Sequence, residues 1–360
     1  MDNRFFFTNT KDESFFANIR ENISVGNYNR VRGIAEANPS DNTYLHFAVD
    51  YFTFYGDMQE KTGIVDPRED PVQEKIEQIT RVDRAYMELH LKKMDITVGM
   101  QKIAWGKSLL WSPFDAFKRV NFYEPGEERR GINAVKTYIP FSSVSGIECV
   151  YIPESTPKKS RGGLRFITNI NGTDLAASVI RNRNDFIEQN IAGFEAKSEY
   201  AFGWWLEYAF LNEKEILTSH KSNYFKSIIG IDYTFSIGSG LYVMGEYFHD
   251  SSGSKHKQYD YLQILQQGKF TQARDYIFST VQYNYSLYTT FQVSTISNLN
   301  DGSIIVIPNL KMNMLPQVDV IFGTNAFFGK EGGEFKLQTV SESLKISGSS
   351  QFYVWTKVHF

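Results

Sequence analysis

Two serine–lysine pairs and six histidines are the side chains in this sequence best suited to covalent or acid–base chemistry. Ser155 with Lys158, and Ser254 with Lys257, have the spacing of a serine nucleophile and its lysine partner. That chemistry needs a helix, whereas both pairs lie in polar segments that read as loops. The histidines form no H-E-x-x-H pattern, although His249 is close enough in sequence to His256 to meet it on one loop. We therefore predict no catalytic residue and no metal site.

Two further segments carry residues that resemble known sites. Gly332-Gly333-Glu334-Phe335 spells the tetrapeptide of cyclic-dinucleotide synthases, but here it precedes the final strand with no room for the α/β domain that the motif requires. The acidic segment 57–77 could attract divalent cations, and a solvated surface is the simpler interpretation. Neither segment predicts a cofactor.

The composition excludes several classes of protein. The 360 residues are 42% hydrophobic and 22% charged, which disfavours disorder, and a net charge of −3 gives no basic surface for nucleic acid. Cys149 is the only cysteine, so neither an intrachain disulfide nor a cysteine-based zinc site can form. Apolar runs such as Ile304-Ile305-Val306-Ile307 are far shorter than the ~20 residues of a membrane-spanning helix. The sequence opens without a signal peptide, which predicts the mature form if the protein is exported.

Apolar and polar residues alternate along most of the chain, which is typical of half-buried strands. In residues 351–360, for example, Phe352, Val354 and Val358 share one face while Trp355 and Lys357 share the other. We predict eighteen strands, with sixteen as the alternative, each long enough to cross a bilayer when tilted. They lie near 3–10, 25–37, 42–54, 82–91, 94–104, 131–140, 145–153, 162–170, 173–182, 189–198, 201–212, 223–236, 239–249, 273–285, 287–297, 303–313, 317–328 and 350–360.

The connections between these strands alternate between short turns and longer polar loops. Asn171-Gly172 is the strongest turn signal, because a type I′ turn needs positive φ at both positions. Strict alternation places all short turns at one end of the sheet. The fold class is therefore all-β: residues 1–360 form a single closed antiparallel transmembrane barrel with short periplasmic turns and long external loops. The high aromatic content, 15%, fits interfacial girdles.

The last strand resembles the sorting signal of bacterial outer-membrane β-barrels, which ends in Phe after alternating apolar residues. Phe352, Val354, Val358 and Phe360 match this assembly signal, while Thr356 departs mildly from it. The resemblance implies location in the outer membrane of a diderm bacterium, contact with its lipid, and recognition by the barrel-insertion machinery.

A second resemblance is internal. Gly99-Met100-Gln101, then Trp105-Gly106, Pro113-Phe114-Asp115 and Arg129-Arg130-Gly131 look like a stretch that recurs in large uncharacterised outer-membrane barrels. Met100 replaces the arginine usual there, so no basic role is expected at that position. No chemistry is assigned to the stretch.

The segment 105–130 holds enough apolar residues that it should not extend freely into water. We expect it to fold inward and narrow the pore, with Pro113 opening a short helix and Leu109, Leu110, Trp111, Phe114 and Phe117 packed on the wall. An external lid packed on other loops is the alternative. The charged residues predicted to line the constriction are Lys107, Asp115, Lys118, Arg119, Glu127, Glu128, Arg129 and Arg130.

Charges on the remaining strands fall on one face, as lipid on the other face requires. The principal residues predicted for the lumen wall are Arg30, Arg32, Arg84, Glu88, Lys136, Arg165, Asp232, Glu246, Asp319 and Lys357. With further members of the same faces, among them Asp50, Glu148, Glu195 and Glu207, acidic and basic residues are equal in number. Equal numbers predict weak charge selectivity, and cross-strand pairing is the structural alternative for any single residue.

The sequence thus predicts a porin-like channel for passive diffusion of small hydrophilic solutes and ions, and no enzyme. A substrate-specific conduit for an oligosaccharide or polymer is the alternative, and an aromatic track or a run of one charge sign would favour it. The solute, the sign of selectivity, and the choice between monomer and homotrimer remain open from sequence.

Overall fold

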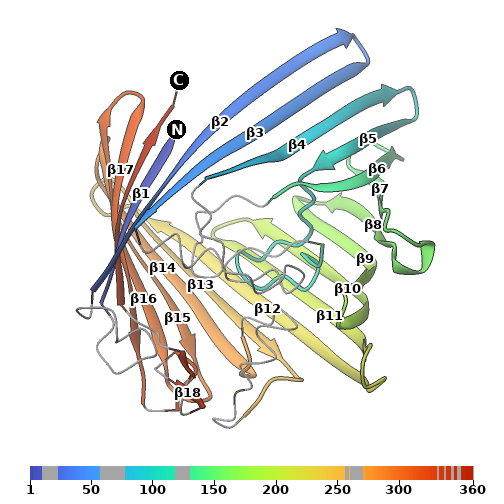
Figure 1. Cartoon of the computed structure of the whole chain (residues 1–360). Helices are drawn as coiled ribbons and strands as arrows, with labels where there is room; N and C mark the ends of the chain where they lie inside the picture. The colour runs from blue at the N-terminus through green and yellow to red at the C-terminus, as the bar shows by residue number, and fades with distance from the viewer. Residues whose placement is uncertain are drawn as a thin grey trace.

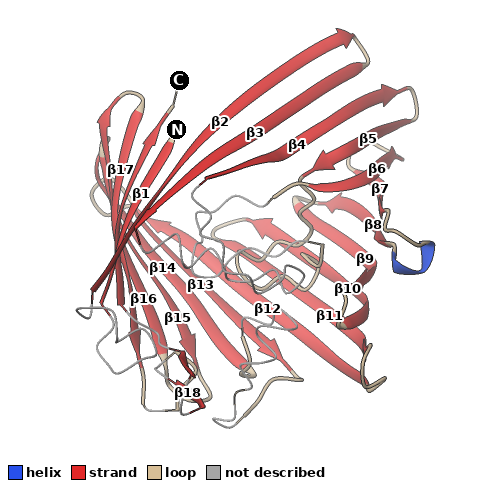
Figure 2. Ribbon diagram, in the orientation of Figure 1, coloured by secondary structure: helices blue, strands red, loops and turns tan. Residues whose placement is uncertain are grey.

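Strands make up nearly all the secondary structure of the computed structural model (Figure 2). The structure describes residues 1–9, 23–56, 78–117, 130–255, 259, 271–330, 332–335, 338–341, 344–346 and 350–359. Within these ranges a single 3₁₀ turn, η1 (Pro157–Lys159), interrupts the strands. No helix in the described ranges is long and apolar enough to cross a membrane.

The main sheet contains eighteen strands. In chain order they are β1 (Asp2–Asn9), β2 (Ile23–Ser40), β3 (Thr43–Gly56), β4 (Gln78–Leu91), β5 (Met94–Gln101), β6 (Ile132–Pro140), β7 (Ser145–Ile152), β8 (Arg161–Ile170), β9 (Thr173–Arg183), β10 (Ile187–Glu199), β11 (Gly203–Glu215), β12 (Lys221–Phe235), β13 (Leu241–Asp250), β14 (Asp275–Ser286), β15 (Thr289–Asn298), β16 (Ile304–Leu315), β17 (Val318–Phe328) and β20 (Ser350–Val358). A separate hairpin, β18 (Gln338–Ser341) with β19 (Leu344–Ile346), lies between β17 and β20.

Each strand of the main sheet pairs antiparallel with its neighbours in the chain. The ladder runs without a crossover from β1–β2 to β16–β17, and β17 then pairs with β20. β20 also pairs with β1, so the first and last strands of the sheet are neighbours. The sheet curves around an interior that contains a segment between β5 and β6 (Figure 1). The all-β, antiparallel prediction is confirmed.

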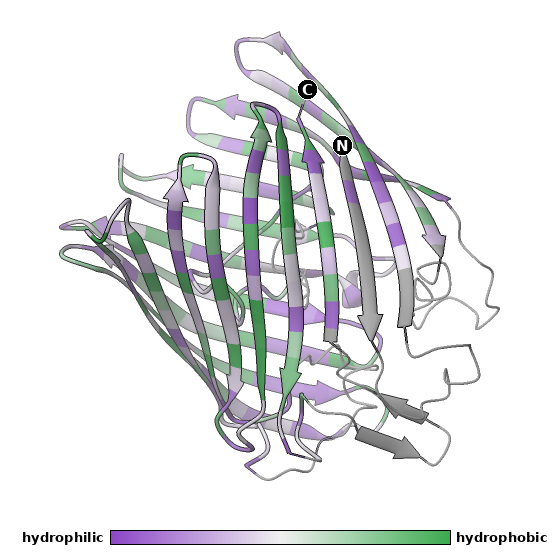
Figure 3. Cartoon of the chain, turned by 90° about the vertical axis from the view of Figure 1, so that its left-hand side faces the viewer, coloured by the Kyte–Doolittle hydropathy of each residue, from purple (hydrophilic) through white to green (hydrophobic). Residues whose placement is uncertain are grey.

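The two faces of the sheet differ in chemistry. Side chains such as Leu164, Val179 and Phe194 are exposed and apolar, whereas the adjacent Arg165 and Glu195 are buried. The same contrast holds for exposed Tyr208 beside Glu207. Hydrophobic and hydrophilic residues accordingly alternate along the strands in Figure 3. The face with buried charges is called the inner face below, and the face with exposed apolar residues the outer face.

The chain termini and short turns such as 41–42 and 171–172 lie at one end of the sheet (Figures 1 and 3). The connection 153–160 lies at the other end, which is called the long-loop end below. At the turn predicted from sequence, Asn171 and Gly172 have φ values of 50° and 82° between β8 and β9, as a type I′ turn requires. The sorting of connections therefore follows from the strictly sequential hairpin order.

Candidate functional site

Residues 102–117, which follow β5, lie against the inner face of the sheet (Figure 1). Their partners come from β7 through β14, so the segment crosses the inner face of eight successive strands. The expected helix at Pro113 does not form. Asp115 N instead donates to Ser112 O at 3.2 Å, so the chain makes a turn there, because the side chains around it bind the wall individually.

Two buried carboxylates of the wall bind the backbone of this segment. Glu207, in the middle of β11, accepts from the amides of Lys107 and Ser108 and, at 2.6 Å, from the Ser112 hydroxyl. Glu246, in the middle of β13, accepts from Ser108 Oγ at 2.7 Å and from Leu109 N at 3.2 Å. Charge-assisted hydrogen bonds of this kind are about twice as strong as neutral ones. The two carboxylates therefore position the segment at mid-height of the sheet.

Aromatic side chains of the segment fill apolar depressions in the wall. Trp105 donates its indole N–H to Glu148 of β7, and Phe117 meets its ring edge-on at 5.4 Å. Phe114 is fully buried in the same cluster. Gly163 on β8 and Gly193 on β10 face these rings, and a Cβ at either position would press on Trp105 or Phe114 respectively. The wall thus lacks side chains where the segment needs room.

Trp111 anchors the far end of the segment on β13 and β14. Its ring stacks on Phe248 at 5.2 Å and lies 5.7 Å from Tyr276. Leu110 packs partly on this cluster, whereas Leu109 is half exposed, contrary to the expectation that it packs on the wall. Leu109 points away because its amide is turned toward Glu246.

The Trp105-Gly106 pair of the internal motif has a physical explanation in this packing. Gly106 adopts φ = 96°, and a Cβ there would overlap the Ser112 side chain and approach the Glu207 carboxylate. Only glycine lets the backbone pass this close to Glu207 while Trp105 occupies its depression.

Of the predicted constriction residues, the structure describes Lys107, Asp115 and Arg130. Lys107 is half-buried with its Nζ 3.9 Å from Asp174 Oδ2, and burial together with nearby Arg165 lowers its pKa. Asp115 is buried rather than exposed. Arg130 is exposed just before β6. Lys118, Arg119, Glu127, Glu128 and Arg129 lie outside the described residues.

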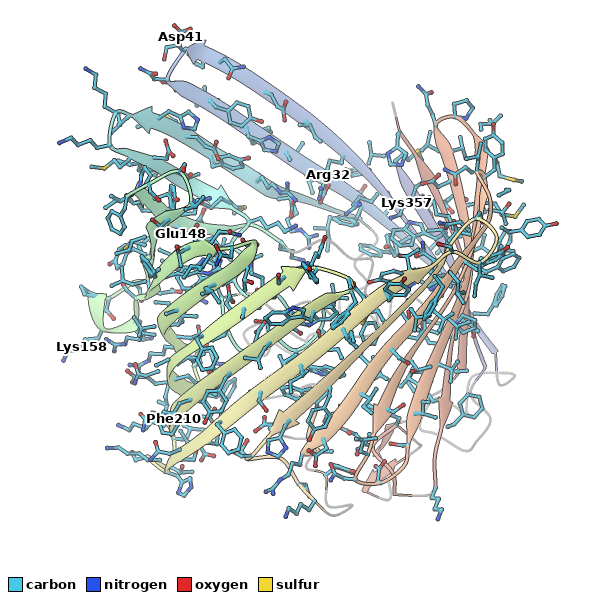
Figure 4. The ribbon with its side chains drawn as sticks, turned by 180° about the vertical axis from the view of Figure 1, so that it is seen from behind. Arg32, Asp41, Glu148, Lys158, Phe210 and Lys357 are labelled. Carbon is cyan, nitrogen blue, oxygen red and sulfur yellow. The ribbon has the colours of Figure 1, made fainter. Side chains whose placement is uncertain are left out.

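Charged residues on the rest of the inner wall form pairs. Arg32 binds Asp50 at 2.7 Å and Asp83 at 3.0 Å, and Arg165 binds Glu195. Asp319 is paired with Lys311 at 2.9 Å, and Asp232 accepts from Tyr242 at 3.1 Å. The remaining residues predicted for the lumen wall differ in exposure. Glu246 is buried, and the partly exposed ones are Arg30, Arg84, Glu88, Lys136 and Lys357. Figure 4 labels Arg32 and Lys357, which come from β2 and β20.

Strict alternation failed to identify Asp83 as a wall residue. A bulge pairs Ala48 with Arg84 and Val49 with Val82, which leaves Asp83 as the extra residue of β4. A bulged residue does not follow the two-residue period, so Asp83 turns inward next to Arg84. The only sign of this bulge in the sequence was that two charged residues, Asp83 and Arg84, are adjacent.

Glu334, from the tetrapeptide set aside above, is buried where three connections meet at the long-loop end. Its carboxylate accepts from Tyr276 Oη at 2.6 Å, Asn298 Nδ2 at 2.7 Å and Gln272 N at 2.8 Å. Its amide donates to Asp301 at 2.7 Å. Burial raises the pKa of Glu334 to about 7. Phe335 joins the same cluster as Trp111, so residues 332–335 and the inward segment share one apolar contact region.

The candidates for other chemistry gain no support. Ser155 and Lys158 are both exposed in the connection before β8, and Lys257 lies outside the described residues. Within the described ranges, no group of three or more potential ligands could hold a metal ion.

The final strand alternates as the sequence predicts. Phe352 is exposed on the outer face, while Tyr353 and Trp355 are buried on the inner face. Val354 and Val358 share the face of Phe352, and Phe360 lies outside the described residues.

No family model matches the sequence, and no curated protein matches it. Solved structures do match in fold over nearly the whole chain. OccAB1 of Acinetobacter baumannii has a TM-score of 0.62 at 9% identity, covering 99% of this chain and 94% of that one. The outer membrane protein opdK of Pseudomonas aeruginosa has a TM-score of 0.57 at 10% identity, covering 99% and 96%.

A BenF-like porin from Pseudomonas fluorescens Pf-5 has a TM-score of 0.59 at 9% identity, covering 98% of this chain and 96% of that one. The chain has the fold of an outer-membrane porin. In this fold, residues 102–117 lie against the inner face of the sheet.

Proposed function

We propose that the protein is a porin-like channel in the outer membrane of a diderm bacterium, where it admits small hydrophilic solutes and ions by passive diffusion. The observation that carries the proposal is the chemical division of the sheet, with ion pairs on the inner face and exposed apolar side chains on the outer face. A charged side chain facing lipid costs about 2–4 kcal/mol at the midplane, so the outer face suits a bilayer and the inner face suits water.

We further propose that the sheet is a single closed barrel of eighteen strands. The pairing of β1 with both β2 and β20 supports closure, because it leaves neither strand as an edge. An open edge inside a membrane would leave backbone groups without hydrogen bonds.

The segment 105–130 is proposed to narrow the passage. Its described part, up to Phe117, crosses the inner face of eight strands and is bound there by Glu207 and Glu246. An external lid would not be expected to bind carboxylates in the middle of two strands. The charges proposed to face the remaining opening are Lys107 and Arg130 with the undescribed Lys118, Arg119, Glu127, Glu128 and Arg129.

Charge selectivity should be weak with a preference for anions. Acidic and basic wall residues are equal in number, but less of the acidic charge is exposed. Glu195, Glu207 and Glu246 are almost completely buried. Arg30, Arg84 and other basic residues keep part of their surface exposed. The sign of a passage is set by the charges that an ion can approach.

The remaining partners follow from the same proposal. The outer face contacts outer-membrane lipid, and the terminal strand, including Phe360, is read by the barrel-insertion machinery. A homotrimer and a monomer both stay open as assemblies, because each leaves the passage within one chain.

One observation favours the oligosaccharide conduit as a second candidate. Aromatic rings line the inner face of β2–β4, with Phe52 stacked near Phe54 at 6.1 Å and His46 on Tyr86 at 5.1 Å. Rings in such a track offer flat apolar surfaces for sugar faces. Current block by maltohexaose at concentrations where glucose has no effect would favour this candidate over general diffusion.

The test of the main proposal is conductance in planar bilayers. We expect stepwise insertion of open channels, with a small reversal potential of anion sign in a salt gradient. Protein that is folded and inserted, as shown by protease protection, but electrically silent would overturn the proposal.

A further inference from the structure

A groove of about 750 Å³ lies on the wall around β7–β11, and its surface combines apolar and basic side chains. Two rows of outer-face residues cross the strands here and form it. The row nearer the middle of the sheet is Cys149, Leu164, Val179, Ala192 and Phe210, which are neighbours in the strand register. The row nearer the long-loop end is Tyr151, Gly162, Arg181, Asn190 and Asn212.

The groove exists because small residues interrupt the outer face. Gly162 and Ala192 stand between larger side chains, of which Leu164, Val179 and Phe210 are each about half exposed. A Cβ at Gly162 would overlap the Val150 carbonyl, so the strand pairing itself requires glycine here. The result is a mainly apolar groove between larger side chains.

The end of the groove nearer the long-loop end of the sheet is basic. Glu188 binds Arg181 at 2.9 Å and Arg183 at 3.5 Å. Arg181 lines the groove, and Arg183 lies in the next register row beyond its end. Arg181 also donates to the backbone carbonyl of Lys158 at 3.2 Å, and this contact brings the exposed η1 turn to the same place. Figure 4 shows Lys158 and Phe210 on the same flank of the sheet.

The next outer-face row adds further positive charge. Arg183, Glu188, Lys214 and Lys221 are successive neighbours across β9–β12. With Lys158, Lys159 and Arg181, six cationic side chains gather around Glu188 on this part of the outer face. The carboxylates of Glu154 and Asp185 lie beside Lys159 and Arg183, so the cations remain in excess.

The basic end is local to this side. At the same end of β13–β17 one outer-face row pairs His249 with Asp275, and the next row is Tyr247, Ile277, Ser297, Ile304 and Phe328. His249 and Asp275 there bind each other at 2.7 Å. Neither row offers a comparable excess of cations among the described residues.

We propose that this groove binds an anionic, phosphate-bearing lipid of the outer leaflet, with an acyl chain against Leu164, Val179 and Phe210 and the headgroup on Arg181 and Arg183. The proposal rests on the proposed function, because the outer face must contact a bilayer with the long loops outward. Charge complementarity selects the occupant: a second copy of this chain would bring the same cations into contact with themselves. Two guanidinium groups fixed by one carboxylate present N–H donors that match phosphate oxygens.

The test uses native mass spectrometry of the folded full chain in detergent. The probes are dimyristoyl phosphatidic acid, phosphatidylcholine with the same chains, and inorganic phosphate. We expect retention of phosphatidic acid in clear preference to phosphatidylcholine, and no retention of inorganic phosphate, because the chain and the headgroup bind together.

Two variants test separately how the headgroup and the acyl chain contribute to binding. The double variant Arg181→Gln and Arg183→Gln should weaken phosphatidic acid binding about thirtyfold, since each basic residue near an anionic headgroup contributes about fivefold. Ala192→Trp should fill the groove and abolish the preference while leaving all charges in place.

Matched controls lie on the other side of the barrel. Lys330→Gln removes an exposed charge at the same end, and Ala326→Trp adds an indole at an outer-face position of β17. Neither should alter lipid retention. A fluorophore on Cys149, the sole cysteine, gives a second readout, because lipid in the groove should shift its emission in the parent chain and not with Trp at position 192.

Equal retention of the two lipids by the parent chain, or equal loss in the arginine variant and its Lys330→Gln control, would overturn the proposal. Conductance is recorded on the same preparations. All four variants should conduct like the parent chain, since none of the changes faces the lumen. Silent channels with selective lipid retention would contradict the proposed function alone, and open channels without selective retention would contradict the lipid site alone.

Discussion

The inner face of β7–β14 and the inner face of β2–β4 carry similar charged residues but use them differently. On β11 and β13, Glu207 and Glu246 bind backbone amides and hydroxyls of residues 107–112, and almost no surface of either carboxylate is exposed. On β2–β4, Arg32 binds Asp50 and Asp83 across neighbouring strands and remains partly exposed. Two carboxylates on β11 and β13 therefore hold a segment of chain, while the charged residues of β2–β4 pair with one another across strands.

The difference shows that the number of charged residues on the inner face does not by itself report how much charge is exposed there. A carboxylate in a sheet can satisfy its hydrogen bonds with cross-strand cations or with an inserted segment. The second use requires glycine and aromatic residues in the segment, as at Trp105-Gly106, so that backbone amides can approach the wall.

Removal of the inserted segment should produce the largest effect. Replacing residues 107–127 by a short Gly/Ser linker should raise single-channel conductance severalfold, because the segment occupies cross-section along half of the wall. Stability should fall only modestly, since the strand ladder stays intact. Single-channel recording and heat-dependent gel migration provide the measurements. Shortening the connection 154–159 in the same way is the control and should leave conductance unchanged. Unchanged conductance in the segment deletion would favour the external lid.

Removal of the carboxylate anchors should release the segment without deleting it. Glu207→Ala leaves three donors of the segment without their acceptor, at a cost of about 1–3 kcal/mol for each donor that water does not reach. We expect conductance between that of the parent and the deletion, with increased open-channel noise from segment motion. Glu88→Ala removes a partly exposed inner-face carboxylate of β4 and should show neither change. Quiet, parent-like current in Glu207→Ala would show that apolar packing alone holds the segment.

Neutralising the opposite wall should change selectivity rather than conductance. Arg32→Gln removes a cation from the passage and frees the charge of Asp50 and Asp83, so the reversal potential should shift toward cations. At about 8 Å in water one charge is worth roughly 0.5 kcal/mol, or about a twofold change in permeability ratio. Reversal potentials at low salt give the measurement. Lys221→Gln, on the outer face, should leave selectivity unchanged, and an equal shift in both variants would remove the assigned role of Arg32.

The smallest expected effect is a pH dependence at the mouth, where residues 332–335 meet the inserted segment through Phe335 and Trp111. Because the pKa of Glu334 is raised in the folded protein to about 7, the folded state favours its protonated form. The stabilisation is complete below the ordinary carboxylate pKa and is lost as pH rises through about 7. Amide hydrogen exchange of residues 332–335, corrected for intrinsic rates, should therefore show less protection at pH 8 than at pH 6. Glu334→Gln should remove this dependence, whereas a persistent pH response in that variant would assign it to another group.

Much of the architecture was predictable from local pattern. All eighteen predicted ranges overlap strands of the main sheet, because a strand with lipid on one face and water on the other must alternate at every residue. The alternation failed at Asp83, where the bulge breaks the period. The expected helix at Pro113 failed because propensity there competes with specific anchoring contacts from distant strands.

The sequence by itself determined the strands, their order and, outside the β4 bulge, the face of most strand side chains, since these depend on a two-residue period and on turn residues such as Asn171-Gly172. Only the tertiary structure decided which charged residues of the inner face bind the inserted segment and which stay exposed. Glu207 lies about a hundred residues from Lys107 and Ser108, and no local pattern distinguishes it from a lumen carboxylate such as Glu88. Local pattern also does not predict that Glu334 is buried or that Gly162 opens a groove on the outer face. Each of these environments is built by side chains from several strands, so it exists only once the sheet has curved and its connections have packed.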